Sequence, residues 1–398
     1  MNNMYAGEPD KGIFNIRYDF DKSHGSYIFD KNTKKSYLDF FGMFSSIPIG
    51  YNHPIFDNDD FLNEIVKVSK FKIVNCEFLT DEYDRFYNKF MDFSSCGGKY
   101  VKSHFVSTGA LAVECAVKAA IHHSKKDNPK ILSVKNDFHG IMSYSNILTT
   151  RFWPITTKMD GFPGGGIWPH FETLDELNKL LSTDDSIAGV IVEPIQSTFG
   201  DNHLSYKFLK GIRDLCTQYE VPLIFDEIQT GFCATGKTWF FEHLDFYPDI
   251  VIFGKKAQVC GFMTLEEFSS ILQTKILYTT WDSDLVDMIR STYVMDVIDN
   301  QNLRESVTLG SQESASVSVL AGDPEGFPIT YSWDALKVDS SLTVHYKEGG
   351  GTYPPGITNI IHSPATSGTF RFQADSAASG NKGDYTYRIL ANDGAISS

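Results

Sequence analysis

Two charged residues that each follow a short apolar segment are the residues of this chain best suited to do chemistry together. Asp226 follows the apolar run 222–225, and Lys255 comes just after the run 250–253. Both runs have the length and composition of buried strands. In an open parallel sheet, groups at the carboxyl ends of strands point into the ligand crevice. We therefore expect a carboxylate and an amine to meet at one site.

A carboxylate and a lysine amine at one site match the needs of pyridoxal 5'-phosphate (PLP). The amine holds the aldehyde of this cofactor as a Schiff base. The carboxylate keeps the pyridine nitrogen protonated, which makes the ring an electron sink. The alternative is that Asp226 and Lys255 are ordinary strand-terminal charges in two loops.

The stretch 103–120 has the pattern of a strand, a glycine and a helix. A short strand at 104–106 leads to Gly109, and a helix rich in small residues begins at Ala110. A glycine before a helix leaves backbone N–H groups open at the positive end of the helix dipole. This arrangement suits a phosphate group, although the same pattern also occurs in helices that bind nothing.

Two more buried strands are expected at 130–134 and 187–192, and both end in polar residues. The first leads to Phe138 and His139, and the second leads to Glu193. The ring of Phe138 could stack on a cofactor ring, or it could be a core aromatic at a strand end.

An amphipathic helix is expected from residue 205 onward. It connects the strand 187–192 to the strand before Asp226, which implies a right-handed βαβ unit. Its apolar residues at helical spacing on one face are Phe208, Ile212, Leu215 and Tyr219.

The wording around Asp226 and Lys255 resembles the class III aminotransferases, which are PLP enzymes of fold type I. The matching segments are PLIFDEIQTGF, TGK, WFFEH, PDIV and FGKKAQ, and the ending GKKAQVCG is most similar to the lysine 6-aminotransferase branch. The resemblance covers about residues 14–304. It implies an α/β fold with a mostly parallel sheet, bound PLP and a homodimer. It also implies transfer of an amino group, such as the terminal amine of L-lysine or a related ω-amine, to a keto acid such as 2-oxoglutarate.

The resemblance implies roles for single residues. Asp226 would bond the pyridine nitrogen, Gln229 would reach the ring hydroxyl, and Lys255 would form the Schiff base and then act as general base. Lys256 would point to the opposite side of a strand or turn. Together, the residues implied to bind the cofactor are Gly109, Ala110, Phe138, His139, Glu193, Asp226, Ile228, Gln229, Lys255 and Thr280.

The remaining implied contacts surround the ring and the phosphate. Ile228 and Phe138 would pack on opposite faces of the ring, and the backbone of Gly109 and Ala110 would bind the phosphate. Glu193 and Gln196 would line the crevice, with His139 in support. Thr280 would reach the phosphate of a neighbouring subunit.

Four residues depart from the family pattern. Ile141 follows Phe-His-Gly, where the lysine branch has an arginine that grips the substrate carboxylate; isoleucine cannot make that bidentate contact. Thr198 replaces a glutamate, and Asp282 and Ser283 replace two glycines. These departures support a second hypothesis, a catalytically impaired or chimeric aminotransferase-like core.

From residue 305 onward the composition changes. After residue 306 there is no Cys or Met, and short alternating runs at 316–320, 329–333, 369–373 and 385–390 are separated by turn signals such as DPEG, YPPG and NKGD. This pattern predicts a small all-β sandwich of the immunoglobulin or cadherin type over 305–398, ending one strand short. It would replace the small C-terminal domain of the family. In the second hypothesis it is an adhesion or virion structural module.

Composition narrows the partners. The chain has 398 residues and a net charge of −15, which makes nucleic acid or an anionic membrane an unsuitable partner. Its six cysteines show no CxxC spacing, so we expect reduced cysteines and no metal site. The N-terminus lacks the features of a signal peptide, and the expected location is cytoplasmic.

Overall fold

The computed structural model describes residues 14, 16–151 and 167–300, together with five strands between residues 316 and 392. The segment 152–171 is rich in Pro, Gly and Trp, which predicts a long loop, and most of it lies outside the described residues. No described helix is long and apolar enough to cross a membrane.

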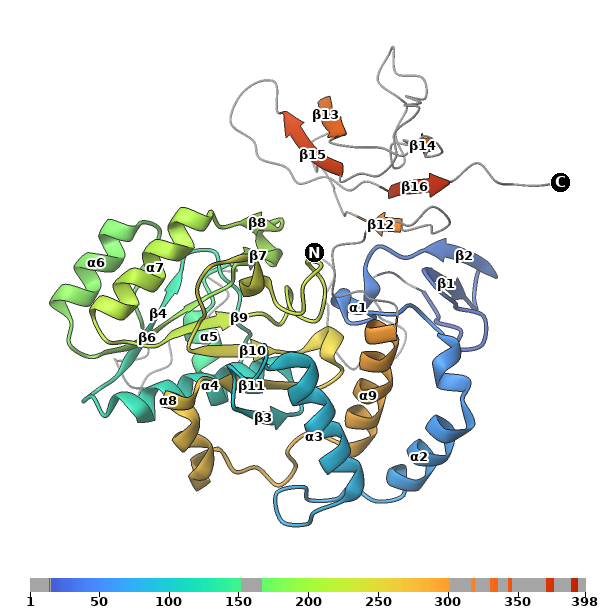
Figure 1. Cartoon of the computed structure of the whole chain (residues 1–398), viewed down its shortest axis with the longest axis horizontal. Coiled ribbons are helices and arrows are strands. Elements are labelled where there is room, and N and C mark those ends of the chain that lie inside the picture. Colours follow the sequence, from blue (N-terminus) through green and yellow to red (C-terminus); the bar gives the residue numbers. More distant parts are fainter. Residues whose placement is uncertain are drawn as a thin grey trace. The chain divides into compact units, whose positions relative to one another are not determined.

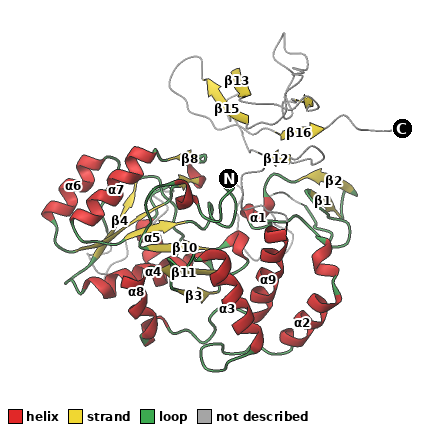
Figure 2. Cartoon of the chain, viewed as in Figure 1, coloured by secondary structure: helices red, strands yellow, loops and turns green. Residues whose placement is uncertain are grey.

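A seven-stranded sheet forms the centre of the first part (Figures 1 and 2). Its strand order is β3-β11-β10-β9-β6-β4-β5, and β11 is the strand that pairs antiparallel to both of its neighbours. The mostly parallel α/β sheet is confirmed. The strands are β3 (Lys102–Val106), β4 (Lys130–Val134), β5 (His170–Phe171), β6 (Ile187–Val192), β9 (Leu223–Asp226), β10 (Ile250–Phe253) and β11 (Cys260–Thr264).

Helices cover both faces of this sheet, because β9 and β10 are apolar on both sides. α4 packs against β11, β10 and β6 on one face, whereas α7 packs on β9 and α6, and α3 packs on α9. The helices are α2 (Asp59–Ser69), α3 (Asp81–Ser94), α4 (Gly109–Ser124), α6 (Leu174–Thr183), α7 (Tyr206–Gln218) and α9 (Leu285–Asn300).

Alternation along the strands decides which face each side chain meets. Ile224 of β9 and Ile252 of β10 belong to the core that contains α4, whereas Phe225 and Phe253 belong to the other core. Because residues two apart in a strand share a face, Asp226 lies on the same side of the sheet as Ile224. The carboxylate that ends β9 therefore faces the side covered by α4.

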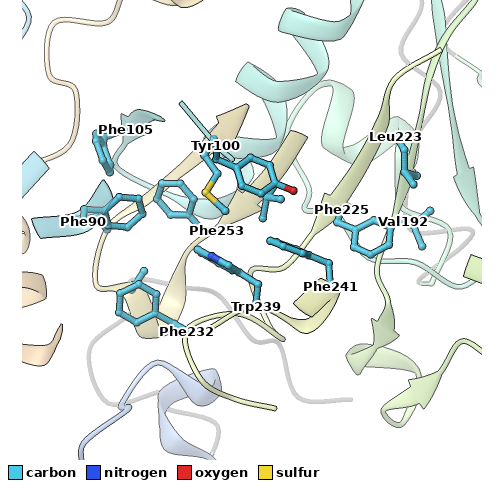
Figure 3. Close-up of a cluster of buried hydrophobic side chains, with 14 of the residues drawn as sticks. Phe90, Tyr100, Phe105, Val192, Leu223, Phe225, Phe232, Trp239, Phe241 and Phe253 are labelled. Carbon is cyan, nitrogen blue, oxygen red and sulfur yellow. The ribbon is translucent and has the colours of Figure 1, made fainter. Parts of the chain in front are cut away.

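The other core contains a cluster of aromatic side chains (Figure 3). Trp239 and Phe241 are fully buried there, and the Trp239 indole N–H donates a 2.8 Å hydrogen bond to the carbonyl of Ser94. Tyr100 donates through its hydroxyl to the carbonyl of Pro248, at 2.9 Å. These bonds tie the segment after β9 to α3 and to the start of β3.

The predicted helix after residue 205 is present, but its core-facing residues differ in part from the predicted set. Ser205 caps α7 by accepting a hydrogen bond from the N–H of Phe208. The buried residues are Leu209, Ile212 and Cys216, while Phe208, Leu215 and Tyr219 lie at the edge of the core. The apolar stripe is wide, so three of the four predicted residues lie at its border and Ile212 lies in its buried centre.

Shorter elements complete the first part. The β-prone runs at 27–29 and 37–40, with a turn between them, predict a hairpin, and it is present as β1 and β2, which pair antiparallel. The elements are β1 (Tyr27–Asp30), β2 (Lys35–Leu38), α1 (Gly42–Ser45), η1 (Pro54–Asp57), α5 (Tyr144–Leu148), β7 (Ile195–Gln196), η3 (Ser197–Phe199), β8 (Asn202–His203), η4 (Phe240–His243), η5 (Lys255–Ala257), α8 (Glu266–Ser269), η6 (Ser270–Gln273) and η7 (Lys275–Leu277).

Five strands are described in the C-terminal part. β12, β16 and β14 form one antiparallel sheet, and β13 and β15 form another. Each of the four predicted strand runs overlaps one of them, although residues 385–387 of the last run lie outside the described residues. The strands are β12 (Ser316–Ser318), β13 (Thr330–Ala335), β14 (Thr343–His345), β15 (Phe370–Asp375) and β16 (Arg388–Asn392).

A substitution at Gly261 tests the packing of the sheet next to the Lys255 turn. A Cβ atom there would lie 2.0 Å from the carbonyl oxygen of His104 and 2.8 Å from the ring of Phe253. We expect Gly261→Ala to lower the free energy of unfolding by about 3 kcal/mol, measured by urea denaturation. Ser103→Ala on β3, which loses one contact to a methionine sulfur, should cost less than about 1 kcal/mol. Equal stability of Gly261→Ala and the parent would contradict this packing.

Candidate active site

Residues after four parallel strands meet at one edge of the sheet. Asp137 follows β4, Glu193 follows β6, Asp226 ends β9 and Lys255 follows β10. Because these strands are parallel to one another, their carboxyl ends lie at the same edge. The predicted carboxylate and the predicted lysine are therefore placed at one edge of the sheet, together with two more acids.

His139 links two of these acids. Its Nδ1 lies 2.8 Å from Asp226 Oδ2, and its Nε2 lies 3.4 Å from Asp137 Oδ2. All three side chains are buried. Burial alone would lower the pKa of His139, but the two carboxylates outweigh it and raise the pKa to about 10. His139 is thus expected to be an imidazolium at neutral pH, and it lies within hydrogen-bond distance of the Asp226 carboxyl group.

Glu193 and Gln196 support the same cluster. Glu193 Oε2 accepts a 2.6 Å hydrogen bond from the backbone N–H of Phe138, and the N–H of Glu193 donates to Asp137 Oδ2 at 3.1 Å. Gln196 donates to Asp137 Oδ1 at 2.6 Å. Burial raises the pKa of Glu193 well above its usual range. These contacts fix the backbone of Phe138, whose ring is half-buried.

The start of α4 lies beside this cluster. A Cβ atom on Gly140 would approach the Cβ of Ala110 to 3.1 Å, and Gly140 has a φ of +119°, which favours glycine. The N–H groups of Gly109 and Ala110 are in the first turn of the helix, where no intrahelical acceptor exists. Thr108 caps the turn by accepting from the N–H of Leu111. The segment 138–140 and the N-terminal end of α4 are thus neighbours.

Ile228 packs between the helix start and the lysine turn. Its Cδ1 would lie 3.0 Å from a Cβ on Gly109, and its Cγ1 would lie 3.5 Å from a Cβ on Gly254. Glycine at both positions lets the Ile228 side chain come close to both backbones. The side chain therefore lies between α4 and Lys255.

The two adjacent lysines both bind Gln229. The amine of Lys255 donates to the side-chain oxygen of Gln229, and the amine of Lys256 donates to its backbone carbonyl at 2.6 Å. Lys256 also lies near the carboxyl of Glu227, and its direction, to the opposite side of a strand or turn, stays a prediction. Lys255 and Lys256 lie in the 3-10 turn η5, and Lys255 has a φ of +51°. In such a turn successive side chains do not alternate as they do in a strand.

Thr280 occupies a different environment. It is exposed, in a segment where the thiol of Cys76 donates to the carbonyl of Thr279 at 3.7 Å. Burial raises the pKa of nearby Asp282. Nothing within this single chain tests the predicted contact of Thr280 with a second subunit.

Two residues of the site were not singled out from the sequence. Asp137 pairs with His139 and accepts from Glu193 and Gln196, and its position directly after a predicted strand was the available signal. Arg151 donates through Nε to the carbonyl of Thr198 at 2.6 Å. No sequence pattern marks Arg151, because its contact with Thr198 forms only in the folded chain.

A sequence profile of the family "Aminotransferase class-III" matches residues 10–313. This chain belongs to the class III aminotransferases. It is 32% identical to the L-lysine-epsilon aminotransferase of Mycobacterium tuberculosis, over 77% of this chain and 76% of that protein. It is 30% identical to the 4-aminobutyrate aminotransferase of Saccharomyces cerevisiae, over 72% of this chain and 70% of that protein.

Solved structures agree with this family. A lysine aminotransferase from M. tuberculosis in the internal aldimine form superposes with a TM-score of 0.68 at 29% identity, and the match covers 76% of this chain and 75% of that one. An ornithine aminotransferase from Toxoplasma gondii superposes with a TM-score of 0.64 at 22% identity, over 75% and 70%, and shows the fold alone. The chain is a PLP-dependent aminotransferase that uses a small-molecule amino donor and a keto-acid acceptor.

The described residues provide the groups that a class III aminotransferase needs to bind PLP. Asp226, held by an imidazolium, is a charged partner for a pyridine nitrogen. The first turn of α4 offers N–H donors to a phosphate. The amine of Lys255 lies at the same edge on a flexible stem. The six cysteines are all free thiols, as predicted.

Proposed function

We propose that this chain transfers a terminal amino group from L-lysine or a related ω-amine to a keto acid such as 2-oxoglutarate. The observation that carries the proposal is the meeting of Lys255 and the His139–Asp226 pair at one sheet edge. Two relatives are named for lysine and for 4-aminobutyrate, and both of these compounds carry a terminal amine. Their names support a terminal amine as the donor.

In the proposed reaction, PLP supplies an electron sink for the carbon that carries the amino group. Lys255 anchors the cofactor and then moves the proton through its amine. Asp226, paired with His139, would face the pyridine nitrogen. Gln229 would contact the ring hydroxyl, and Ile228 and Phe138 would pack on the two faces of the ring.

The other proposed contacts hold the cofactor. The N–H groups of Gly109 and Ala110 bind the phosphate, and Glu193 positions the Phe138 backbone. Gln196 holds Asp137, which orients His139 from the side opposite Asp226. None of these residues needs to change its contacts for the proton transfer at Lys255.

A donor panel tests the proposed reaction. Purified protein loaded with PLP is mixed with 2-oxoglutarate and L-lysine, ornithine, 4-aminobutyrate or an amine without a carboxylate, and glutamate formation is measured. Glutamate formation from the ω-amines supports the proposal. Bound PLP without glutamate formation from any donor favours the second hypothesis, an impaired core, which the replacements at Ile141 and Thr198 motivate.

A gain of function is expected at position 141. Ile141 is 75% exposed, so an arginine side chain can be accommodated there without repacking the core. We expect Ile141→Arg to lower the KM for the substrate that carries a carboxylate by about tenfold, because a bidentate guanidinium contact is gained. Ile141→Met, which adds no charge, is the control. An unchanged KM for every carboxylate substrate would contradict a carboxylate site at this position.

We further propose a homodimer, with Thr280 at the phosphate of the neighbouring subunit. Two segments that touch expose large apolar side chains: the amine of Lys72 lies 4.7 Å from the ring centre of Trp281. Such a patch is typical of a protein interface. The exposed residues of these segments are Phe71, Phe78, Leu79, Tyr278 and Trp281.

A charge placed in this patch tests the dimer. Leu79 is 82% exposed, and we expect Leu79→Glu to convert a dimer into a monomer in sedimentation velocity, because a carboxylate would be buried in the interface. Lys207→Glu on α7 should leave the dimer intact. A monomeric parent protein with full activity would contradict the proposal.

For the C-terminal part, we propose an immunoglobulin-like or cadherin-like β-sandwich over residues 305–398, following an aminotransferase domain over 1–304. Two antiparallel sheets among the described strands support this interpretation. Limited proteolysis tests it: a stable fragment that begins near residue 305 is expected, and complete degradation of this part would contradict an independent domain.

A further inference from the structure

The pair of lysines in η5 meets at a single residue. Lys255 reaches the side-chain oxygen of Gln229, and Lys256 reaches its backbone carbonyl. Gln229 follows β9 in the same loop as Ile228, and η5 follows the neighbouring strand β10. Lys256 therefore joins two loops that carry the proposed contacts to PLP.

The surroundings of Lys256 are those of a positioned group. Lys256 is partly buried and lies near the buried carboxyl of Glu227. The oxygens of Glu227 accept from the N–H groups of Phe240 and Phe241, at 2.6 and 3.0 Å, and from the hydroxyl of Thr230 at 3.0 Å. Glu227 thus accepts hydrogen bonds from three other donors, and the Lys256 amine donates to the carbonyl of Gln229.

The pKa of the Lys256 amine is set by three neighbouring effects. Burial lowers the pKa of the Lys256 amine, and the neighbouring charge of Lys255 lowers it further. Glu227 opposes both effects, and the resulting pKa is about 7. A neutral amine still donates a hydrogen bond, so the contact with the Gln229 carbonyl persists in either protonation state. The hydrogen bond from Lys256 to the Gln229 carbonyl is therefore expected for both the charged and the neutral amine.

We propose that Lys256 is a positioning residue for Lys255: it fixes the Gln229 carbonyl, so that the Gln229 side chain holds the Lys255 amine at the cofactor site. The inference rests on the proposed role of Lys255. It assigns to the second lysine a function that acts only through Gln229. Lys256 itself does not need to touch cofactor or substrate.

The test is the rate at which Lys255 binds added PLP, followed by visible absorption after mixing with apoprotein. We expect Lys256→Met to slow this step by about tenfold, since one hydrogen bond that positions Gln229 is lost. Lys256→Gln, which keeps an N–H donor, should stay within about threefold of the parent. Thermal unfolding of each variant checks that it is folded.

The decisive comparison uses the Gln229→Ala background. If Lys256 acts through the Gln229 side chain, adding Lys256→Met to Gln229→Ala slows the step no further. If Lys256→Met slows PLP binding equally in that background, its role is merely structural and the inference is overturned. The inference is also overturned if Lys256→Gln binds PLP tenfold more slowly than the parent. This second criterion applies even if Lys256→Met does not fold. A parent protein with no absorption change at all would refute the proposed cofactor site instead.

Discussion

Replacing Lys255 by alanine is expected to abolish both the visible absorption of bound PLP and the transfer of amino groups. Lys255 provides the amine at the sheet edge that contacts the side chain of Gln229. Lys255 is expected to anchor the cofactor and also to move the proton. General acid–base catalysis alone accelerates a reaction by about 100-fold to 10,000-fold. We therefore expect glutamate formation to fall by at least about 1,000-fold.

Lys256→Gln is the matched control for this prediction, because it removes the neighbouring amine from the same turn. It should keep the absorption band and most of the activity. A band that persists in Lys255→Ala and disappears in Lys256→Gln would show that the assignment of the two lysines is reversed. Circular dichroism of both variants verifies the fold.

The second large effect is expected for Asp226→Asn. The change removes the charge that His139 holds at 2.8 Å and leaves an amide in place of the carboxylate. A pyridine nitrogen without an anionic partner loses its proton, and the ring becomes a poorer electron sink. We expect kcat to fall by about 100-fold to 1,000-fold, a loss comparable to that of a preorganised electrostatic contact. Binding of PLP should weaken less, since the phosphate contacts remain.

Asp249→Asn is the control for Asp226→Asn. Asp249 precedes β10 at the opposite edge of the sheet, where it pairs with Arg213 and accepts from the N–H of Leu223 at 2.7 Å. Its replacement should lower stability and leave kcat unchanged. If both variants lost kcat alike, the loss would reflect a damaged sheet and not the chemistry of Asp226.

The charge on His139 also sets an expectation for pH. Its pKa is about 10 in the folded chain and about 6.5 in an unfolded one. Since the folded value is the higher one, the stability that this pairing contributes is fully present below pH 6.5 and is lost as pH rises toward 10. The pairing of His139 with Asp226 is therefore expected to persist at neutral pH.

Much of the sheet could be predicted from the sequence, because buried parallel strands are short apolar runs that end in turns. The runs 187–192 and 250–253 match β6 and β10, and their ends place Glu193 and Lys255 at one edge. Helix starts were also predictable: Thr108 and Ser205 both cap helices through their side chains.

The parts that the sequence could not predict depend on contacts between distant residues. The central position of Asp137 arises from bonds to His139, Glu193 and Gln196, which belong to different loops. The contact of Lys256 with the Gln229 carbonyl joins the 3-10 turn after β10 to the loop after β9. Hydrophobic periodicity carries no information on either feature.

The most direct test of the central claim is to find where the cofactor attaches. The PLP-loaded protein is reduced with borohydride, digested and analysed by mass spectrometry. We predict that the phosphopyridoxyl mass is found on Lys255, in the peptide that follows the IVIFG segment. Modification of Lys256 or of a lysine outside this sheet edge, with Lys255 unmodified, would contradict the account.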